Sequence, residues 1–348
     1  MRGYRLLACT MLAIATPAAA EVPLSTIQAK ADALEAKVIA WRRDIHQHPE
    51  LGNNEVRTAA LVAKHLKSLG LEVREHVGKT GVVGILRGGK PGGVVALRAD
   101  MDALPVTEAT GLPFASTVRT TFNGQEVGVA HACGHDAHVA MLMGAAELLA
   151  GMKADIPGTI VFVFQPAEEG PPQGEEGGAK LMLAEGAFAN PVPQATFGIH
   201  VWPARAGTLS WRPGGMMAEA KTFRIQLDGS QTHGAMPWAG IDIVAQTATT
   251  VQEINRLTAR TVDPTRFPTV LSVATINAGV RYNIIPQTAN LSGTMRTFDR
   301  EQSADLESRV VKLVDSIAAI YGSKAKTEFI LAGPLTYNEP ELANWLKG

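Results

Sequence analysis

The chain has 348 residues and a formal net charge of −1, with 32 Lys and Arg against 33 Asp and Glu. Hydrophobic residues make up 46% and charged residues 19%, which is ordinary for a globular protein and leaves room for two domains. No basic run is present that could follow a phosphate backbone, so nothing in the sequence indicates nucleic acid as a partner.

Residues 1–20 are predicted to be an export signal. Arg2 and Arg5 supply the positive start, 6–15 is an apolar stretch too short to span a membrane, and three alanines at 18–20 offer a cleavage site. A buried N-terminal helix is the alternative interpretation. No later segment is long and apolar enough to cross a bilayer, so we expect a periplasmic or secreted protein that is not attached to a membrane.

Cysteine usage follows from this prediction. Cleavage after Ala20 removes Cys9 and leaves Cys133 as the only cysteine, so the mature chain cannot form an internal disulfide. A single thiol in an oxidising compartment is vulnerable unless it is buried or bound. The count therefore favours a ligand role for Cys133.

In chain order, helical periodicity first alternates with short apolar runs. Helices are predicted at 24–48, about 55–69 and 139–149, and strands at 82–86, 94–99, 159–164 and 196–199. The first helix ends before Pro49, because the residue preceding proline is pushed out of helical geometry. The alternation predicts an α/β domain with a largely buried sheet flanked by helices.

From about residue 213 the pattern changes. Strands are predicted at 221–228, 269–277, 287–296 and 325–331, and helices at about 241–260 and 301–321. The stretch 221–228 alternates polar and apolar residues, as a half-exposed strand does. This βαββαβ order predicts a compact α+β domain at 213–328, inserted between a first segment at 21–212 and a second segment that starts at 329.

Three of the apolar strands end in potential metal ligands. These are Asp100 and Asp102 after strand 94–99, Glu168 and Glu169 after strand 159–164, and His200 after strand 196–199. In open α/β sheets, ligands bind beyond the carboxyl ends of the strands. Because three strands end in such residues, the sequence predicts one shared metal site at this edge of the sheet.

A fourth contribution comes from the segment 131–138. Cys133 and His135 stand two residues apart just before a predicted helix, and Gly134 lets the backbone turn sharply between them. A helix N-terminus or a bound cation favours the thiolate. The alternative interpretation is a capping loop with incidental histidines.

The adjacent pair Glu168 and Glu169 also favours a cation. Two neighbouring carboxylates at a buried strand end repel each other and are costly to desolvate. A divalent cation would resolve this if Glu169 ligates it and Glu168 accepts a proton from the attacking water. The alternative is a solvated acidic turn.

Taken together, the segments 41–52, 98–105, 131–138, 164–169 and 198–200 resemble the aminoacylase/hippurate hydrolase/auxin-conjugate hydrolase branch of the di-metal carboxypeptidase-like amidohydrolase family. The resemblance covers the mature chain nearly end to end. It implies a zinc-peptidase-like catalytic domain with a mixed sheet, an inserted lid and dimerisation domain, and hydrolysis of the amide bond of N-acyl amino acids by metal-activated water.

The resemblance also implies roles for individual residues. The implied metal ligands are Cys133, His135, Glu169 and His200. Glu168 matches the general base, and Asp102 matches an acid that orients a metal-binding group. Asp100 lies where distant relatives carry a metal histidine, and its role stays open. Two divalent ions are expected, zinc or manganese, with nickel and cobalt as further candidates.

The segment 229–237 resembles the family segment whose histidine reaches across a homodimer to the substrate carbonyl. His233 would then help to stabilise the oxyanion. Asn283 and Arg296 resemble groups that hold the substrate carboxylate; turn and surface roles are the alternative. The expected partners are a small N-acyl amino acid and a second copy of the chain through the inserted domain.

The C-terminal segment departs from the family pattern. Relatives continue for several tens of residues past the position of Gly348 and carry a further metal-ligating histidine, whereas no histidine follows His233 here. We therefore expect the second catalytic segment, 329–348, to be truncated. Two alternatives to hydrolysis of N-acyl amino acids stay open: a non-catalytic relative that binds metal or a small ligand, and a dipeptidase or carboxypeptidase.

Overall fold

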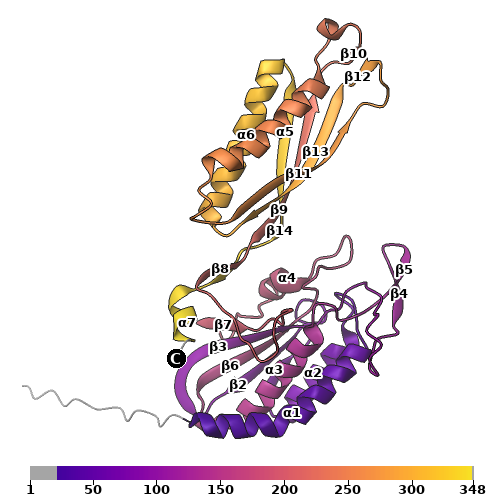
Figure 1. Ribbon diagram of the computed structural model, residues 1–348. Coiled ribbons are helices and arrows are strands. Elements are labelled where there is room, and N and C mark those ends of the chain that lie inside the picture. The colour runs from indigo at the N-terminus through magenta and orange to yellow at the C-terminus, as the bar shows by residue number, and fades with distance from the viewer. Residues whose placement is uncertain (1–21, 347–348) are drawn as a thin grey trace, which may run out of the picture. The chain divides into compact units, whose positions relative to one another are not determined.

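The computed structural model describes residues 22–346, so the predicted export signal at 1–20 lies outside the described residues. The chain divides into two compact units, one ending at Ala204 and the other beginning at Arg205 (Figure 1). Among the helices of residues 22–346, none has both the length and the apolar character that a membrane span needs. The finer domain bounds at 213 and 328 stay a prediction.

The first unit is built on a five-stranded sheet in the order β1-β2-β6-β3-β7. Its strands are β1 (Glu72–Arg74), β2 (Val82–Arg87), β3 (Lys90–Asp100), β6 (Pro157–Gln165) and β7 (Ala195–Gly198). Strand β3 runs parallel to β6 and β7, while β1, β2 and β6 are antiparallel neighbours. The predicted α/β fold with a mixed sheet is confirmed.

Helices cover both faces of this sheet. They are α1 (Leu24–Gln47), α2 (Val56–Ser68), α3 (His135–Ala150) and α4 (Gly178–Ala184), with a short 3₁₀ turn, η1 (Lys153–Asp155), before β6. Alternate residues of β6 face opposite cores: Phe162 packs in the cluster that includes residues of α1, α2 and α3, and Val161 packs with Met182 of α4. Burying a side chain such as Phe162 contributes about 1.5–3 kcal/mol, which explains the near-continuous apolar run of this strand.

Local sequence sets the ends of two elements near the site. Helix α1 ends at Gln47, as expected from His48 and Pro49. Helix α3 begins at His135, four residues earlier than predicted, because Gly134 adopts a φ of 85° that few other residues tolerate. The early start places His135 in the first helical turn.

The second unit is a four-stranded antiparallel sheet in the order β11-β13-β9-β14 with two long helices. The elements are β9 (Glu219–Asp228), α5 (Ile243–Thr261), β11 (Thr269–Ala278), β13 (Thr288–Thr297), α6 (Arg300–Tyr321) and β14 (Lys324–Gly333). Shorter elements are β8 (Gly214–Met217), β10 (Thr232–His233), η2 (Pro237–Ala239), β12 (Ile284–Ile285), β15 (Thr336–Asn338) and α7 (Pro340–Trp345). The predicted βαββαβ order is confirmed.

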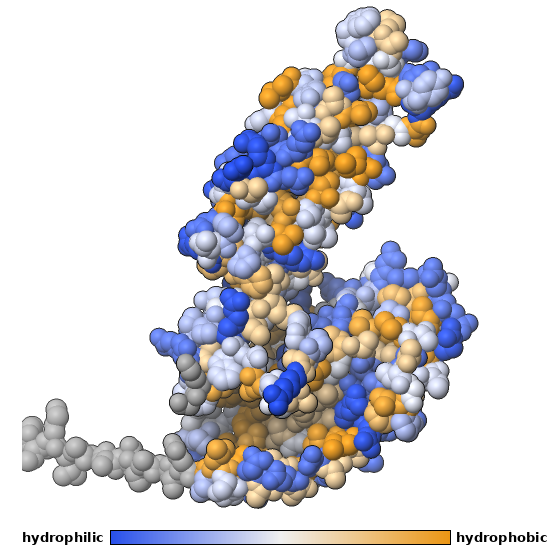
Figure 2. All heavy atoms as spheres, viewed as in Figure 1, coloured by the Kyte–Doolittle hydropathy of each residue, from blue (hydrophilic) through white to orange (hydrophobic). Residues whose placement is uncertain are grey.

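One face of this sheet is solvated, as predicted. Phe223, Ile225 and Leu227 of β9 are buried in a core with residues of α5 and α6, while Arg224 and Gln226 between them are exposed. Several large apolar side chains of the unit are nevertheless exposed, and Figure 2 shows apolar residues on its visible face. Such surfaces are typical of sites that meet a partner.

Candidate metal centre

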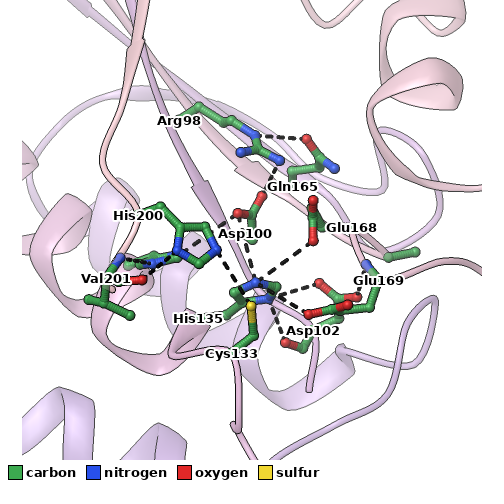
Figure 3. Close-up of polar contacts among 12 residues, drawn as sticks. Arg98, Asp100, Asp102, Cys133, His135, Gln165, Glu168, Glu169, His200 and Val201 are labelled. Atoms are coloured by element: carbon green, nitrogen blue, oxygen red, sulfur yellow. Dashed lines mark hydrogen bonds and ion pairs between the residues drawn. The ribbon is translucent and has the colours of Figure 1, made fainter. Parts of the chain in front are cut away.

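The ends of three strands and the start of one helix bring the predicted ligands together (Figure 3). Asp100 is the last residue of β3, and Asp102 follows it. Glu168 and Glu169 follow β6, His200 follows β7, and Cys133 lies two residues before the start of α3. The carboxyl ends of the parallel strands thus meet in space as the sequence predicts.

Three groups of side chains in the described residues have ligand atoms within 4.8 Å of one another. They are Cys133, His135 and His200; His135, Glu168 and Glu169; and Asp100, His135 and His138. Cys133 Sγ lies 3.5 Å from His200 Nε2. Because His135 belongs to all three groups, it is the centre of the cluster.

The protonation of His135 follows from its contacts. Its Nδ1 lies 2.8 Å from the carbonyl oxygen of Asp102. A carbonyl can only accept, so Nδ1 carries the proton and donates it, and the lone pair is left on Nε2. A histidine that ligates a metal is usually held in this way by its other ring nitrogen.

The surroundings of this lone pair fit a cation. His135 Nε2 is buried without a hydrogen-bond partner. It lies 3.9 Å from Oε2 of Glu168, 4.0 Å from Oδ2 of Asp100 and 4.0 Å from Oε1 of Glu169. A lone pair facing three carboxylates is unfavourable unless a proton or a metal ion lies between this nitrogen and the carboxylates. Imidazole, thiolate and carboxylate are donors that zinc accepts, and the oxygen and nitrogen donors also suit manganese.

Asp102 joins two of the predicted ligands. Its side chain is buried; Oδ2 accepts a hydrogen bond from the backbone N–H of Glu169 at 2.9 Å, and Oδ1 lies 3.2 Å from His135 Nδ1. Fixing both the Glu169 backbone and the His135 ring reduces the freedom of the ligands before any ion binds.

Asp100 and His138 form a second buried layer. Asp100 pairs with Arg98, whose Nε donates to Gln165 at 2.9 Å. His138 Nε2 accepts from the N–H of Val201 at 2.9 Å, so its proton sits on Nδ1, 3.7 Å from an oxygen of Asp100. Burial would raise the pKa of Asp100, but His138 and Arg98 outweigh it and lower that pKa.

His138 is a member of the cluster that was not predicted as a site residue. The available signal was its spacing of three residues from His135, which places both side chains on one face of a helix. Its partners could not be read from the sequence, because Val201 lies 63 residues further along the chain.

The pKa values of Glu168 and Cys133, two groups of the cluster, differ from their ordinary values. Burial, and then the negative charge of Asp100, raise the pKa of Glu168, which moves a candidate base toward neutrality. Burial and the neighbouring Glu169 raise the pKa of Cys133 to about 12. A thiolate at this position therefore needs a cation beside it.

The predicted residues of the second unit do not all lie together. His233 is exposed at the end of β10, next to β12, and Asn283 accepts a hydrogen bond from Gly234 N–H at 2.9 Å through its carbonyl. Arg296 lies at the opposite end of β13, since it pairs with Ala220 at the start of β9. Within this unit the structure brings His233 and Asn283 together but not Arg296.

Comparisons with known proteins agree with this fold and cluster. The family model described as peptidase family M20/M25/M40 matches residues 96–347. The chain is 43% identical over 314 residues to thermostable carboxypeptidase 1 of Saccharolobus solfataricus, covering 89% of this chain and 76% of the relative. It is 39% identical over 299 residues to an N-acyl-L-amino acid amidohydrolase of Geobacillus stearothermophilus, covering 86% and 77%.

A solved structure supports the same relationship. The Bacillus subtilis YXEP protein, described as a dinuclear metal binding peptidase from the M20 family, superimposes with a TM-score of 0.75 at 33% identity, covering 90% of this chain and 78% of that protein. The similarity extends over both units of the chain. This chain therefore belongs to the peptidase family M20/M25/M40.

Proposed function

We propose that this protein is a metal-dependent amidohydrolase that cleaves the amide bond of N-acyl amino acids. The observation that carries the proposal is the buried, unpartnered Nε2 of His135, surrounded by three carboxylates and adjoining Cys133 and His200. Relatives named as N-acyl-L-amino acid amidohydrolase and N-acetyl-L-cysteine deacetylase support this substrate class.

Cys133, His135, Glu169 and His200 would hold the metal in this proposal. A divalent cation, when bound, polarises the amide carbonyl and makes a water molecule acidic enough to react near neutral pH. Two ions of zinc or manganese are proposed because the cluster offers more candidate ligands than a single ion usually takes and because the YXEP relative is described as dinuclear.

Glu168 would move the proton. Its raised pKa and its place beside His135 suit a carboxylate that accepts a proton from the attacking water and then delivers it to the leaving amine. Asp102 would keep His135 and the Glu169 backbone in place during this transfer.

A homodimer through the second unit is part of the proposal. His233 would help to stabilise the oxyanion of a partner's substrate, and Asn283, beside it, would bind the carboxylate of that substrate. Arg296 lies at the opposite end of β13, so it would bind the carboxylate of a different substrate molecule. Two large aromatic side chains lie close to these residues in the sequence: Trp238 is 78% exposed and Tyr282 is 95% exposed. Aromatic residues with this exposure in a single protomer are typical of a surface that a second copy covers. Sedimentation of the wild type and of a Trp238→Ala, Tyr282→Ala double variant tests it; two monomeric proteins would contradict it.

Export to the periplasm or the medium is also proposed, on the basis of the charged start and apolar stretch of residues 1–20. Cell fractionation of the full chain and of a chain lacking residues 2–20 tests this. Retention of both forms in the cytoplasm would contradict it.

A carboxypeptidase is the second candidate, because the relative from Saccharolobus solfataricus carries that name at 43% identity. The distinguishing experiment assays the purified chain against N-acyl amino acids and dipeptides, with zinc or manganese added and with EDTA as control. We expect EDTA-sensitive release of the amino acid from N-acyl substrates. Preference for dipeptides would favour the carboxypeptidase, and no turnover with either metal would contradict both.

A further inference from the structure

His138 is a buried histidine of the first unit that has no role in the proposed function. It is 2% exposed and follows His135 by three residues on α3. Its ring belongs with Asp100 and His135 to one of the three groups of candidate ligands. A neutral imidazole binds a metal ion only through a nitrogen whose lone pair is free, so the role of His138 depends on how its two nitrogens are used.

Neither nitrogen of His138 has a free lone pair. Nε2 accepts a hydrogen bond from the backbone N–H of Val201 at 2.9 Å. The proton of the neutral ring then lies on Nδ1, which is 3.7 Å from Oδ2 of Asp100, where a negative charge favours an N–H group. A ring in this state cannot coordinate a cation, although it lies beside other candidate ligands.

Val201 connects this contact to His200, its neighbour in the chain (Figure 3). The carbonyl of Val201 accepts a hydrogen bond from Nδ1 of His200 at 2.6 Å, so the proton of His200 lies on Nδ1. The lone pair of His200 is left on Nε2, which lies 3.5 Å from Sγ of Cys133. The N–H and the carbonyl of Val201 therefore link His138 to a proposed metal ligand.

The side chain of Val201 makes a further contact with the segment that carries two other proposed ligands. A Cβ atom on Gly134 would lie 2.2 Å from Cγ2 of Val201, so this side chain fits only against a glycine. Gly134 stands between Cys133 and His135 and adopts a φ of 85°. Val201 thus packs on the turn between these ligands, while His138 holds its backbone from the first turn of α3.

His200 needs such support because its own strand is short. Strand β7 has four residues, stands at the end of the strand order and pairs with β3 as far as Gly198. His200 lies two residues beyond this last pair and is exposed. Exposed segments at the ends of elements open more easily than the core does. The buried bond to His138 reduces the freedom of this segment before an ion binds.

We propose that His138 is a positioning residue and not a metal ligand: its Nε2 holds the Val201 backbone, and this fixes His200 beside Cys133. The inference rests on the proposed metal-dependent function and goes beyond it, because it removes one member from the three groups of candidate ligands and gives that residue another role. Residues that orient metal ligands contribute about 10–100-fold to metal affinity.

Two substitutions distinguish the two nitrogens of His138. The glutamine of His138→Gln is long enough to place its amide oxygen near the position of Nε2, where it can accept from the N–H of Val201. The asparagine of His138→Asn is one methylene shorter, so its amide lies near the position of Nδ1, beside Asp100, and does not reach Val201. His76→Asn, at an exposed histidine, is the control. Thermal unfolding of each metal-free protein confirms folding.

Titration with Co²⁺, followed by the absorption of the cobalt–thiolate bond, measures affinity and the number of bound ions without any turnover. We expect His138→Asn to bind Co²⁺ about 10–100-fold more weakly than the wild type, with the number of ions unchanged. His138→Gln and His76→Asn should bind within about threefold of the wild type.

Three results of this titration would overturn the inference. Loss of one ion per chain in both His138 variants would make His138 a ligand. Equal weakening in His138→Gln and His138→Asn would exclude the contact with Val201 as the cause. Equal affinities in all four proteins would show that His138 does not position any ligand.

A double-mutant cycle tests whether His138 acts through His200. In a chain that already carries His200→Ala, we expect His138→Asn to weaken Co²⁺ binding by less than about twofold further, because the ligand that it positions is gone. A further loss of about tenfold would show that the two residues act independently, and it would overturn the inference.

These measurements keep the inference separable from the proposed function. The expected pattern of Co²⁺ affinities without turnover of N-acyl amino acids would support the role of His138 and contradict the amidohydrolase. Turnover together with equal Co²⁺ affinities in all proteins would overturn the role of His138 and leave the amidohydrolase standing. Absence of Co²⁺ binding by the wild type would overturn both.

Discussion

The carboxylate of Glu55 accepts a hydrogen bond from the backbone N–H of Ala167 at 2.8 Å, although the two residues are 112 positions apart. The Thr80 hydroxyl donates to the other carboxylate oxygen. Ala167 has a φ of 46°, a conformation that costs a residue other than glycine about 1 kcal/mol. Glu55 thus holds the backbone bend that immediately precedes Glu168.

The stability of the protein should depend on the ionisation of Glu55. Burial raises the pKa of Glu55 from 4.5 to about 7. Because the pKa of Glu55 is higher in the folded protein than in the unfolded chain, protonation of Glu55 stabilises the fold. This stabilisation is fully present below pH 4.5 and is lost as the pH rises through 7. The shift corresponds to about 3 kcal/mol.

Urea unfolding with EDTA present, at several values between pH 4.5 and 8, measures this effect in the wild type and in Glu55→Gln. The glutamine does not titrate; its Oε1 can accept from Ala167 N–H, and its N–H₂ group can donate to the Thr80 hydroxyl, which then acts as the acceptor. We expect the wild type to lose about 3 kcal/mol relative to the variant across this range. If the free energies of unfolding of the two proteins changed with pH in the same way, Glu55 would not titrate as described.

Glu168→Gln should separate turnover from metal binding. Its side chain is 38% exposed and is the proposed base, while the four proposed ligands stay intact. We expect kcat to fall by 100-fold or more, the range of general-base contributions, with metal content equal to wild type by atomic emission. Equal loss of metal and activity would make Glu168 a ligand instead.

His135→Ala should remove metal most completely, because His135 belongs to all three groups of candidate ligands. We expect less than about a tenth of the wild-type metal content after dialysis, against a smaller loss in Cys133→Ser, which affects one group. His76→Ala, at an exposed histidine, is the control. Full metal content in His135→Ala would exclude the proposed centre.

Asp102→Asn should weaken metal binding without removing a proposed ligand. The substitution places an N–H₂ group or a weaker acceptor opposite His135 Nδ1 and Glu169 N–H. Substitutions at such supporting residues lower metal affinity about 10–100-fold, which competition with a chelator measures. Asp155→Asn, at a surface residue, should bind metal as the wild type does; equal affinities in all three proteins would contradict the role of Asp102.

The two faces of the second sheet should respond differently to alanine. Phe223 is fully buried against α5 and α6, so Phe223→Ala should lower the free energy of unfolding by about 3–5 kcal/mol. Its neighbour Arg224 faces solvent, and Arg224→Ala should change stability by less than about 0.5 kcal/mol. Similar losses in both variants, measured by urea unfolding, would contradict a solvated face.

Much of the fold could be predicted because its signals are local. The apolar run of β6 and the alternation of β9 depend on neighbours in the sequence, and both strands occur where these patterns predict them. The family resemblance is confirmed by the match over residues 96–347, which includes four of the five segments that carry it. Helix α3 was predicted four residues short, because polar His135, Asp136 and His138 masked its helical periodicity.

The sequence by itself determined which residue types stand at the ends of the strands, and so predicted Cys133, His135, Glu169 and His200 as candidate ligands. The tertiary structure decided that His135 lies at their centre and that its proton sits on Nδ1, toward the Asp102 carbonyl. It also decided that Glu55 holds the backbone of Ala167 from a distant segment and that His138 accepts a hydrogen bond from the distant Val201. The physical reason is that periodicity depends on neighbouring residues, whereas hydrogen-bond partners depend on how packed strands and helices bring distant residues together.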